Sequence, residues 1–416
     1  MNYAQAESYL LDLELFGMRF GLDRMRKLTT ALGMPQRRFA SVHVVGTNGK
    51  SSTARMVAAV LARHGLRTGC YTSPHLRSFR ERAEVGGVPV SEADFAAAVT
   101  RAAHAAALVD RTLEGDDRVT QFELLTAAAF HALARAGVEV AVIEAGLGGR
   151  HDATNVIPSK VQVLTGVGLE HTRWLGPTLG HIAEEKLAVV PAHGVLVAPE
   201  LPDEVEAVAA RTARERPARQ ITVPPGAERG LPPLARAPGA FQRRNFALAC
   251  AAAEAFLGGA LEPAAVRAAA AEIIVPGRLE PVAERPLVLL DGAHNPSGAE
   301  ALADSLPEVV GARPLVGGVA VLDDKDAAGV LRPLLPLLAR AVFTRGSGER
   351  YLPPATLASL ADQLQPGLET EVVRQPAAAL ARAKALAGEA GAVLATGSLH
   401  LLADLVRAPE VRASSL

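Results

Sequence analysis

Short apolar runs alternate with longer segments of helical periodicity along most of the chain. Runs such as "FASVHVVG", "VEVAVIEAG", "VQVLTGVG" and "HGVLVAPE" are rich in β-branched residues and stop at glycine or polar residues. The segment "STARMVAAVLARHG" instead repeats apolar residues at helical spacing and ends at Gly65. Apolar strands that alternate with such helices are typical of βαβ units, in which both faces of a parallel sheet are buried. The pattern therefore predicts an α/β fold with a mostly parallel sheet.

This pattern is interrupted once and then starts again. The stretch "ERPARQITVPPGAERGLPPLARAPGA" is rich in Pro, Gly and Arg and predicts strand-and-loop structure at the edge of a first domain, followed by a helix in "QRRNFALACAAAEAFLGG". After "VPGRLEPVAERP", the strand-then-loop pattern returns in "LVLLDGAHNP", "RPLVGGVAVLDDKD" and "GAVLATGS". The length of 416 residues also exceeds one hydrophobic core, which stops growing near roughly 250–300 residues. We predict two domains, residues 1–283 and a smaller one at 284–416.

Charge and composition exclude several classes of protein. The formal net charge is -1, from 43 basic and 44 acidic residues, so no global field favours nucleic acid or an anionic membrane. No apolar run approaches the roughly 20 residues that span a bilayer, and the first residues contain acids and lack a basic leader. Cys70 and Cys250 lie in apolar surroundings without metal-ligand spacing. We expect a cytoplasmic protein with neither a nucleic-acid nor a membrane partner.

The segment "VHVVGTNGKSST" has the features of a phosphate-binding loop. Gly46, Gly49, Lys50 and Ser51 form a G-x-x-G-K-S core directly after a predicted strand and before a predicted helix. Backbone N–H groups and the helix N-terminus then face phosphate oxygens, the lysine neutralises them and a hydroxyl reaches Mg²⁺. The usual loop has four residues between its glycines and this one has two. The strand and helix that flank the loop favour nucleotide binding over a plain turn with an exposed lysine. They do not decide whether the protein is a hydrolase, a kinase, a ligase or a nucleotide-dependent switch.

Polar residues also follow two other predicted strands. Glu144 ends the strand in "VEVAVIEAG" and would face the same crevice as the loop, and His171 occupies an equivalent place after the next strand. A carboxylate, a hydroxyl and phosphate oxygens suit Mg²⁺, whereas histidine is a less usual ligand. The alternatives are a structural Glu144 that caps a neighbour and a hydrogen-bonded structural His171. Lys186 follows two acids in "HIAEEKLAVV", and on that pattern alone we interpret it as a solvated helix lysine.

Together these motifs resemble the folylpolyglutamate synthases and dihydrofolate synthases, which are ATP-dependent ligases of the Mur ligase superfamily. The resemblance spans nearly the whole chain, in the order "FGLDRMRKLTTALGMPQ", "GTNGKSS", "YTSPHL", "TQFELLT", "EAGLGGRHDATN", "EHTRWLGPTLGHIAEEK", "NFALA", "PGRLE", "DGAHNP", "DDKD" and "TGSLH". The phosphate loop is shared with Mur enzymes generally, whereas "TSPHL", "GLGGRHDATN" and "DGAHNP" together are specific to the folate branch. The resemblance implies an N-terminal P-loop ATPase-type domain and a smaller C-terminal Rossmann-like α/β domain with the glutamate-ligase role.

The resemblance also implies a role for each matching residue. Ser73, Glu144 and His171 match magnesium ligands, and Lys186 matches a lysine that the family carries as a carbamate and that would help hold a second Mg²⁺. The ATP contacts implied are Asn48, Gly49, Lys50, Ser51, Ser52, Asn245, Arg278 near phosphate and Asp291 near ribose. His294 and Ser398 match positions near the incoming glutamate, so Lys50, Lys186, His294 and Ser398 form the implied catalytic set. The pterin would lie near Thr120, Phe122 and Asp152, with the loop from Phe20 to Asp23 closing over it.

The chain departs from the family pattern at several positions. Ser51 stands where the family usually has glycine, so two adjacent hydroxyls, Ser51 and Ser52, compete for one role. Glu170 replaces an aspartate, Ala145 a common valine and His400 a usual tyrosine. None of these changes removes a residue assigned to catalysis.

The function implied is ATP-dependent addition of L-glutamate to dihydropteroate and reduced folates through an acyl phosphate, with release of ADP and phosphate. Relatives of this kind lead us to expect a monomer and a bifunctional enzyme. The sequence does not decide between dihydropteroate, reduced folates and both, nor does it fix the polyglutamate length. The alternatives are a Mur-type ligase acting on a UDP-linked cell-wall precursor and a P-loop ATPase that ligates nothing.

Overall fold

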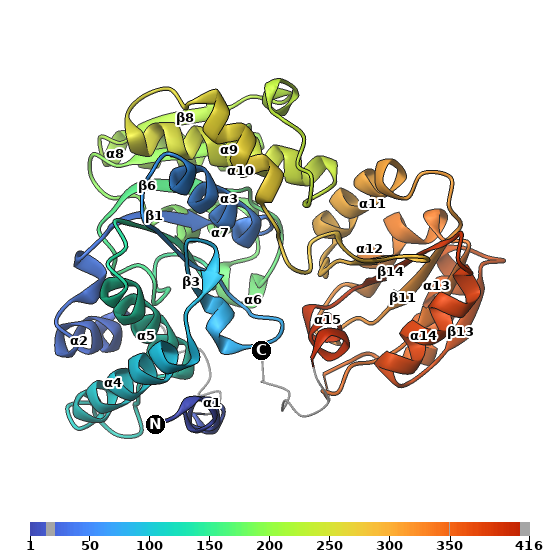
Figure 1. The fold of residues 1–416 in the computed structure, drawn as a ribbon, viewed down its shortest axis with the longest axis horizontal. Coiled ribbons are helices and arrows are strands. Elements are labelled where there is room, and N and C mark those ends of the chain that lie inside the picture. The colour runs from blue at the N-terminus through green and yellow to red at the C-terminus, as the bar shows by residue number, and fades with distance from the viewer. Residues whose placement is uncertain (14–20, 349, 408–416) are drawn as a thin grey trace. The chain divides into compact units, whose positions relative to one another are not determined.

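The computed structural model describes residues 1–13, 21–348 and 350–407. Contacts divide the chain into two units, one of Met1–Pro232 with Arg244–Ala270 and the other of Pro233–Arg243 with the chain from Ala271 onward. Each unit contains one sheet with helices packed on it (Figure 1). The predicted α/β fold, with a mostly parallel sheet in the first unit and a smaller α/β unit after it, is confirmed.

The first unit is built on an eight-stranded sheet within the described residues, in the order β4-β3-β2-β5-β1-β6-β7-β8. The strands from β2 to β8 in that order run parallel, and the pairs β2–β3 and β3–β4 are antiparallel. The central strand β1 is apolar on both faces apart from Ser41 and His43, as expected for a strand covered on both sides. The bounds are β1 Ala40–Val45, β2 Thr68–Tyr71, β3 Ala83–Val85, β4 Val88–Pro89, β5 Val140–Glu144, β6 Ser159–Leu164, β7 Val195–Pro199 and β8 Arg219–Val223.

The second unit contains a six-stranded sheet in the order β13-β12-β11-β14-β10-β9. Its strands are parallel except β9, which pairs antiparallel with β10 at one edge. The segment "VPGRLEPVAERP" therefore supplies an edge strand of this sheet. The bounds are β9 Glu280–Glu284, β10 Leu287–Leu290, β11 Leu315–Val319, β12 Arg340–Phe343, β13 Glu369–Val372 and β14 Ala392–Thr396.

Side-chain caps fix where several helices begin. Thr120 and Glu123 form a capping box at α5, and Ser91, Thr178 and Asn295 accept backbone N–H groups at α4, α7 and α11. The helices are α1 Tyr3–Asp12, α2 Asp23–Ala31, α3 Lys50–Arg63, α4 Glu92–Asp110, α5 Gln121–Arg135, α6 Thr172–Leu175, α7 Leu179–Leu187, α8 Asp203–Glu215, α9 Ala240–Leu257, α10 Pro263–Glu272, α11 Pro296–Val310, α12 Ala327–Leu334, α13 Pro354–Leu364, α14 Pro376–Ala387 and α15 Leu399–Val406. Among these described helices, none combines the length and apolarity needed to cross a bilayer.

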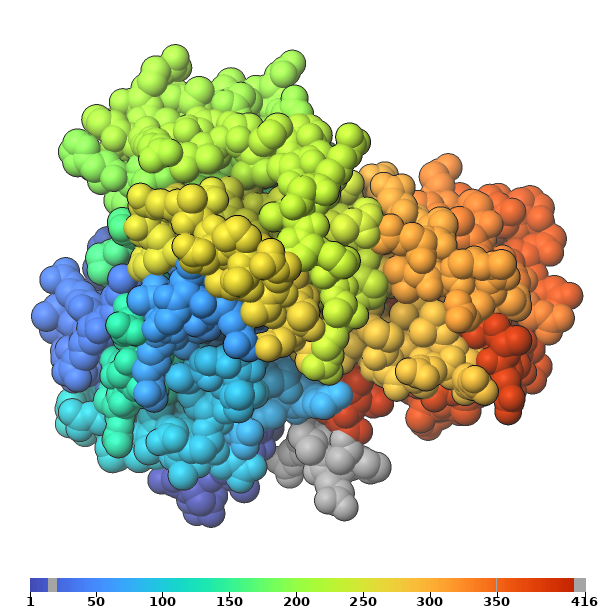
Figure 2. Space-filling model, turned by 45° about the horizontal axis from the view of Figure 1, so that its top comes forward, coloured from blue at the N-terminus to red at the C-terminus, as the bar shows by residue number. Residues whose placement is uncertain are grey.

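Helices α9 and α10 lie against α3, the helix that follows the GTNGKSS loop (Figure 2). The backbone N–H of Glu262 donates to His64 Nε2 at 3.0 Å, which joins the start of α10 to the end of α3. The Lys160 ammonium donates to the carbonyl of Phe256 at 2.8 Å, which joins β6 to α9. Asn245 on α9 lies beside Gly49, the residue before α3.

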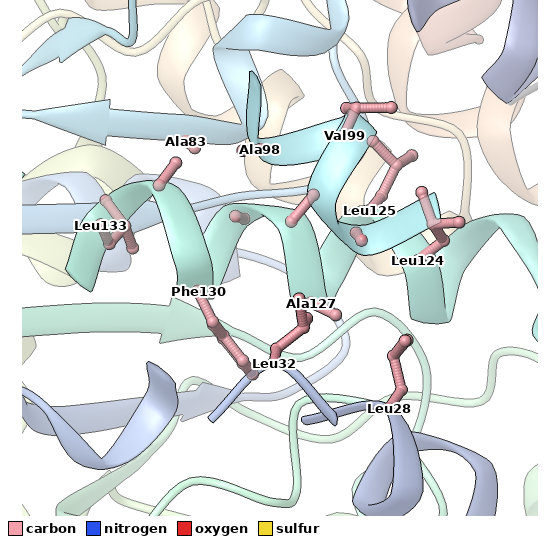
Figure 3. Close-up of a cluster of buried hydrophobic side chains, with 14 of the residues drawn as sticks. Leu28, Leu32, Ala83, Ala98, Val99, Leu124, Leu125, Ala127, Phe130 and Leu133 are labelled. Atoms are coloured by element: carbon pink, nitrogen blue, oxygen red, sulfur yellow. The ribbon is translucent and has the colours of Figure 1, made fainter. Parts of the chain in front are cut away.

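The largest core of the first unit lies between the sheet and helices α2, α4 and α5. Figure 3 shows Phe130 pointing from α5 toward Leu32 at the end of α2. The Phe130 side chain is fully buried and makes edge-to-face contacts with Phe39 and Tyr71, with ring centroids 6.3 Å apart in both pairs. This aromatic group joins the sheet to the helices that cover it.

Removing the Phe130 ring should therefore destabilise the first unit. Phe130→Ala is expected to lower the free energy of unfolding by about 3–5 kcal/mol, because it loses buried area and leaves a cavity. Trp174, the only tryptophan, lies in the same unit, so urea unfolding followed by its fluorescence measures this effect. Phe130→Leu should cost clearly less, and a loss below ~1 kcal/mol for Phe130→Ala would contradict the importance of this core.

Candidate functional site

The loop from Gly46 to Lys50 connects β1 to α3 in a conformation that needs glycine. Gly46 has φ +152°, and a Cβ there would lie 1.9 Å from Thr165 Oγ1. Gly49, the residue before α3, has φ +81°, and a Cβ there would lie 2.8 Å from Asn245 Oδ1. The Thr165 hydroxyl also donates to the carbonyl of Asn48 at 2.6 Å. The loop is thus fixed by the end of β6 and by α9, with the first turn of α3 immediately after it.

Two lysines meet at one carbonyl of this loop. Lys50 Nζ donates to the carbonyls of Gly46 and Thr47 at 3.1 Å each, and Lys186 Nζ donates to Gly46 at 2.7 Å. Lys186 is only 4% exposed, so its interpretation as a solvated helix lysine was wrong. Packing of α7 turns this residue inward, which adjacent acids in the sequence do not indicate. Burial, together with the neighbouring Lys50, lowers the pKa of Lys186 to about 7.

A buried carboxylate lies at the same end of the sheet. Glu144 ends β5 and is 2% exposed, and its two oxygens accept from the Ser51 hydroxyl at 2.9 Å and from the Ser73 backbone N–H at 3.0 Å. The structure therefore brings Ser51, Ser73 and Glu144 together from three elements. Ser52 follows Ser51 and is buried, and its Oγ has no hydrogen-bond partner among the residues that the structure describes. Ser51 and Ser52 thus differ in environment, which the sequence could not show.

His171 lies in the segment that connects β6 to α6. It precedes α6 with φ +52°, and its imidazole Nε2 lies 3.9 Å from a carboxylate oxygen of Glu170. Its side chain is 40% exposed, unlike the buried Glu144. Over the part of the chain that the structure describes, no three His, Cys, Asp or Glu side chains are close enough to form a metal site by themselves. Any metal here would thus need hydroxyl, phosphate or water oxygens as further ligands.

Two of the three residues expected near the pterin, Phe122 and Asp152, lie at one loop after β5. Thr120 caps α5, and the Phe122 ring packs on Gly146, where a Cβ would come within 2.5 Å of it. Asp152 is buried and accepts from the backbone N–H of Leu147 at 2.8 Å and of Thr154 at 3.0 Å. Burial raises the pKa of Asp152, and these hydrogen bonds oppose the shift. Asp23 begins α2, whereas Phe20 lies outside the described residues.

Asp291, His294 and Ser398 lie in the second unit, after strands β10 and β14, and Arg278 precedes β9. Asp291 follows β10 and accepts from the backbone N–H groups of Leu279 and Ala293 at 2.7 and 2.8 Å. Burial raises the pKa of Asp291, and the nearby Arg278 opposes this. His294 Nδ1 lies 2.8 Å from the carbonyl of Gly292. Ser398 is buried before α15, where its Oγ accepts from His400 N–H at 3.1 Å and lies 3.4 Å from Tyr351 Oη.

Some residues that shape these sites were not among the candidates predicted from the sequence. Glu123 accepts from Thr120 and from Arg24 Nε, which joins α2 to the beginning of α5. The spacing of Thr120 and Glu123 is a capping-box signal that was available. Arg24 and Thr165 carry no comparable local signal, because their partners are distant in the sequence.

Comparison with known proteins gives consistent matches over the chain. The family described as "Mur ligase, glutamate ligase domain" matches residues 277–399. The dihydrofolate synthase/folylpolyglutamate synthase of Mycobacterium tuberculosis is 38% identical over 382 residues, which cover 82% of this chain and 77% of that protein. The solved structure of the M. tuberculosis folylpolyglutamate synthase complexed with ADP has a TM-score of 0.88 and 34% identity, covering 96% of both chains. A bifunctional folylpolyglutamate synthase/dihydrofolate synthase of Yersinia pestis, complexed with AMPPNP and an Mn ion, has a TM-score of 0.82 and 27% identity and covers 97% of both chains.

Proposed function

Because the chain belongs to the dihydrofolate synthase/folylpolyglutamate synthase family, we propose that it is an ATP-dependent ligase that joins L-glutamate to dihydropteroate and to reduced folates. The observation that carries this proposal is the meeting of Lys50 and Lys186 at the Gly46 carbonyl, on a loop whose next residue, Ser51, bonds Glu144. This arrangement supplies the Lys50 cation and an N–H-rich helix start for a polyphosphate. A buried carboxylate lies next to them.

The described side chains fit a divalent metal bound together with ATP. Glu144 provides a buried carboxylate and Ser51 a hydroxyl that already contacts it, and both are hard oxygen ligands of the kind Mg²⁺ prefers. We propose Ser73, Glu144 and His171 as protein ligands, as the family resemblance implies. When bound, the metal would neutralise charge on the phosphate oxygens.

The chemistry that we propose begins with a carboxylate, which is a poor electrophile. Its oxygen attacks the γ-phosphorus of ATP, ADP leaves, and an acyl phosphate forms. The amine of L-glutamate then attacks the acyl carbon, the carbon–oxygen bond to phosphate breaks, and the amine loses a proton. Because the first step brings two anions together, Lys50 and Arg278 are proposed to offset their charge. Asn48, Gly49, Ser52 and Asn245 would hold the nucleotide, with Asp291 at the ribose.

Lys186 is proposed to act as a carbamate. Its amine is buried and its pKa is lowered to about 7, so near neutral pH a large share is the uncharged nucleophile that can add CO₂. The modification replaces a cation with an oxygen-bearing anion beside the loop. This anion would help hold a second Mg²⁺.

We keep the division at residues 283 and 284 as a functional proposal. Residues 1–283 would bind phosphate and pterin, with Thr120, Phe122 and Asp152 at the pterin. Residues 284–416 would bind L-glutamate, with His294 and Ser398 as its contacts. His294 would orient the amine or the phosphate, and we do not assign it as a general base. The protein is proposed to act as a monomer.

Product analysis tests this function directly. The protein is incubated with ATP, Mg²⁺ and L-glutamate and either dihydropteroate or tetrahydrofolate, and product masses and ADP are measured. We expect one glutamyl unit added to each substrate, with ADP release that depends on it. ADP release only with a UDP-linked peptide precursor would favour a Mur-type ligase, and ATP hydrolysis without any glutamyl product would favour a non-ligating ATPase.

The two serines after Lys50 should have separable roles. Ser51→Ala should raise the Mg²⁺ concentration needed for half-maximal rate, because Ser51 contacts Glu144, the proposed ligand. Ser52→Ala should raise KM for ATP roughly tenfold with little change in Mg²⁺ requirement, because its buried hydroxyl bonds none of the described residues and is proposed to donate to phosphate. Both effects are measured by titrating the rate of each variant with Mg²⁺ and with ATP. If Ser52→Ala changed the Mg²⁺ requirement and Ser51→Ala changed KM for ATP, the two proposed roles would have to be exchanged.

A further inference from the structure

A buried chain of hydrogen bonds joins β1 to the loop that follows β5. His43 lies on β1 and is fully buried, and its Nε2 is 2.8 Å from the hydroxyl oxygen of Thr154. The Thr154 hydroxyl in turn donates to Asp152 Oδ1 at 2.5 Å. The three residues therefore form one continuous series, which crosses from the strand to the loop.

Hydrogen-bond chemistry assigns the direction of this series. The Asp152 carboxylate only accepts, so the Thr154 hydroxyl hydrogen points to it and the Thr154 oxygen is left to accept from His43. His43 Nε2 must then carry the hydrogen, and within the described part of the chain the buried His43 Nδ1 has no hydrogen-bond partner. Burial lowers the pKa of His43 to about 3, which keeps the ring neutral, and the hydrogen bond to Thr154 sets its tautomer.

Asp152 is the point at which the series reaches the rest of the loop. Its other oxygen, Oδ2, accepts from the backbone N–H of Leu147, and Oδ1 also accepts from the backbone N–H of Thr154. The Asp152 carboxylate therefore bridges the backbone at Leu147 and at Thr154, the two ends of this segment. Gly146, immediately before this segment, packs against the Phe122 ring. A displacement of Thr154 would therefore also displace Asp152 and, through it, both ends of the loop.

We propose that His43 is a positioning residue of the folate site, which holds Asp152 and its loop in place through Thr154. This proposal rests on the proposed function, because it takes Asp152 and Phe122 as pterin contacts. His43 does not touch substrate in this assignment. It acts by donating one buried hydrogen bond whose loss leaves the Thr154 oxygen without its donor.

Steady-state kinetics of four variants test the assignment. Thr154→Val and His43→Leu should each raise KM for dihydropteroate roughly tenfold, with kcat lowered less and KM for ATP within about twofold of wild type. Thr154→Ser keeps the hydroxyl and should restore a near-normal KM. The double variant His43→Leu/Thr154→Val should be no worse than the poorer single variant, because both remove the same bond.

A control and a second measurement separate positioning from general damage. Thr29→Val also removes a buried hydroxyl, one that donates to the Met25 carbonyl at 2.9 Å on α2, and should leave KM for dihydropteroate unchanged. Hydrogen exchange of the Leu147 and Thr154 amides, which needs no activity, should be at least about tenfold faster in His43→Leu.

The outcomes distinguish this proposal from the proposed function. Absence of any dihydropteroate-dependent ADP release by the wild-type protein would refute the function, while amide exchange would still decide whether His43 holds the loop. Unchanged exchange in His43→Leu would overturn the positioning role. Equal rises in KM for ATP and for dihydropteroate would overturn the assignment to the folate site.

Discussion

Lys186→Ala should reduce kcat/KM roughly 10²–10³-fold for both pteridine substrates. The variant loses the buried ammonium beside the Gly46 carbonyl and with it the proposed carbamate. ADP release at saturating ATP measures the effect. Lys160→Ala is the matched control, because Lys160 also donates to a carbonyl, that of Phe256, but does so at an exposed position. Near-normal activity of Lys186→Ala would exclude a catalytic role for this lysine.

The carbamate itself is tested by its dependence on CO₂ and pH. The uncharged amine adds CO₂, and the pKa of Lys186 is lowered to about 7, so the protonated and unreactive form predominates below that pH. Enzyme freed of CO₂ should regain activity when bicarbonate is added, and should regain it more slowly at pH 6 than at pH 8. Native mass spectrometry should show a CO₂ adduct that is absent from Lys186→Ala. Full activity without CO₂ at every pH would refute the modification.

Glu144→Gln should have a comparable effect for a different reason. The substitution keeps the size of the side chain but removes the negative charge proposed to bind Mg²⁺, so kcat/KM should fall roughly 10²–10³-fold. The Mg²⁺ concentration needed for half-maximal rate should rise as well, and titration of the rate with Mg²⁺ measures both quantities.

The control for this variant lies at the other end of the same strand. Glu139 precedes β5 and accepts from the Arg67 backbone N–H at 2.7 Å. Glu139→Gln should leave the Mg²⁺ dependence unchanged. Loss of activity in Glu144→Gln with an unaltered Mg²⁺ requirement would remove Glu144 from the proposed ligands.

The positions of several strands along the chain and that of the phosphate loop could be predicted because they depend on local patterns. β-branched apolar runs indicated β1, β5, β6 and β7, and glycine spacing after β1 indicated the loop, because both signals lie within a dozen residues. Glu144 could be placed at a strand end for the same reason. These features need no knowledge of how distant segments pack.

Features that depend on packing could not be predicted in this way. The burial of Lys186 follows from which face of α7 meets the loop, and the two acids before it gave the opposite indication. Ser51 and Ser52 are adjacent in sequence, but successive residues on a helix point in different directions, so one reaches Glu144 and the other is buried. His43 and Thr154 are separated by 111 positions and are joined only by the fold.

The bond between His43 and Thr154 has a consequence for engineering this enzyme family. The loop from Gly146 to Thr154 looks in the sequence like an exchangeable module, bounded by glycines and following a regular strand. Its anchor, however, lies on β1, three positions before the loop that begins at Gly46. A chimaera that imports this loop from a relative would thus need a compatible partner at position 43. A library that varies only the loop would therefore lose loop sequences that are functional when position 43 is varied together with them.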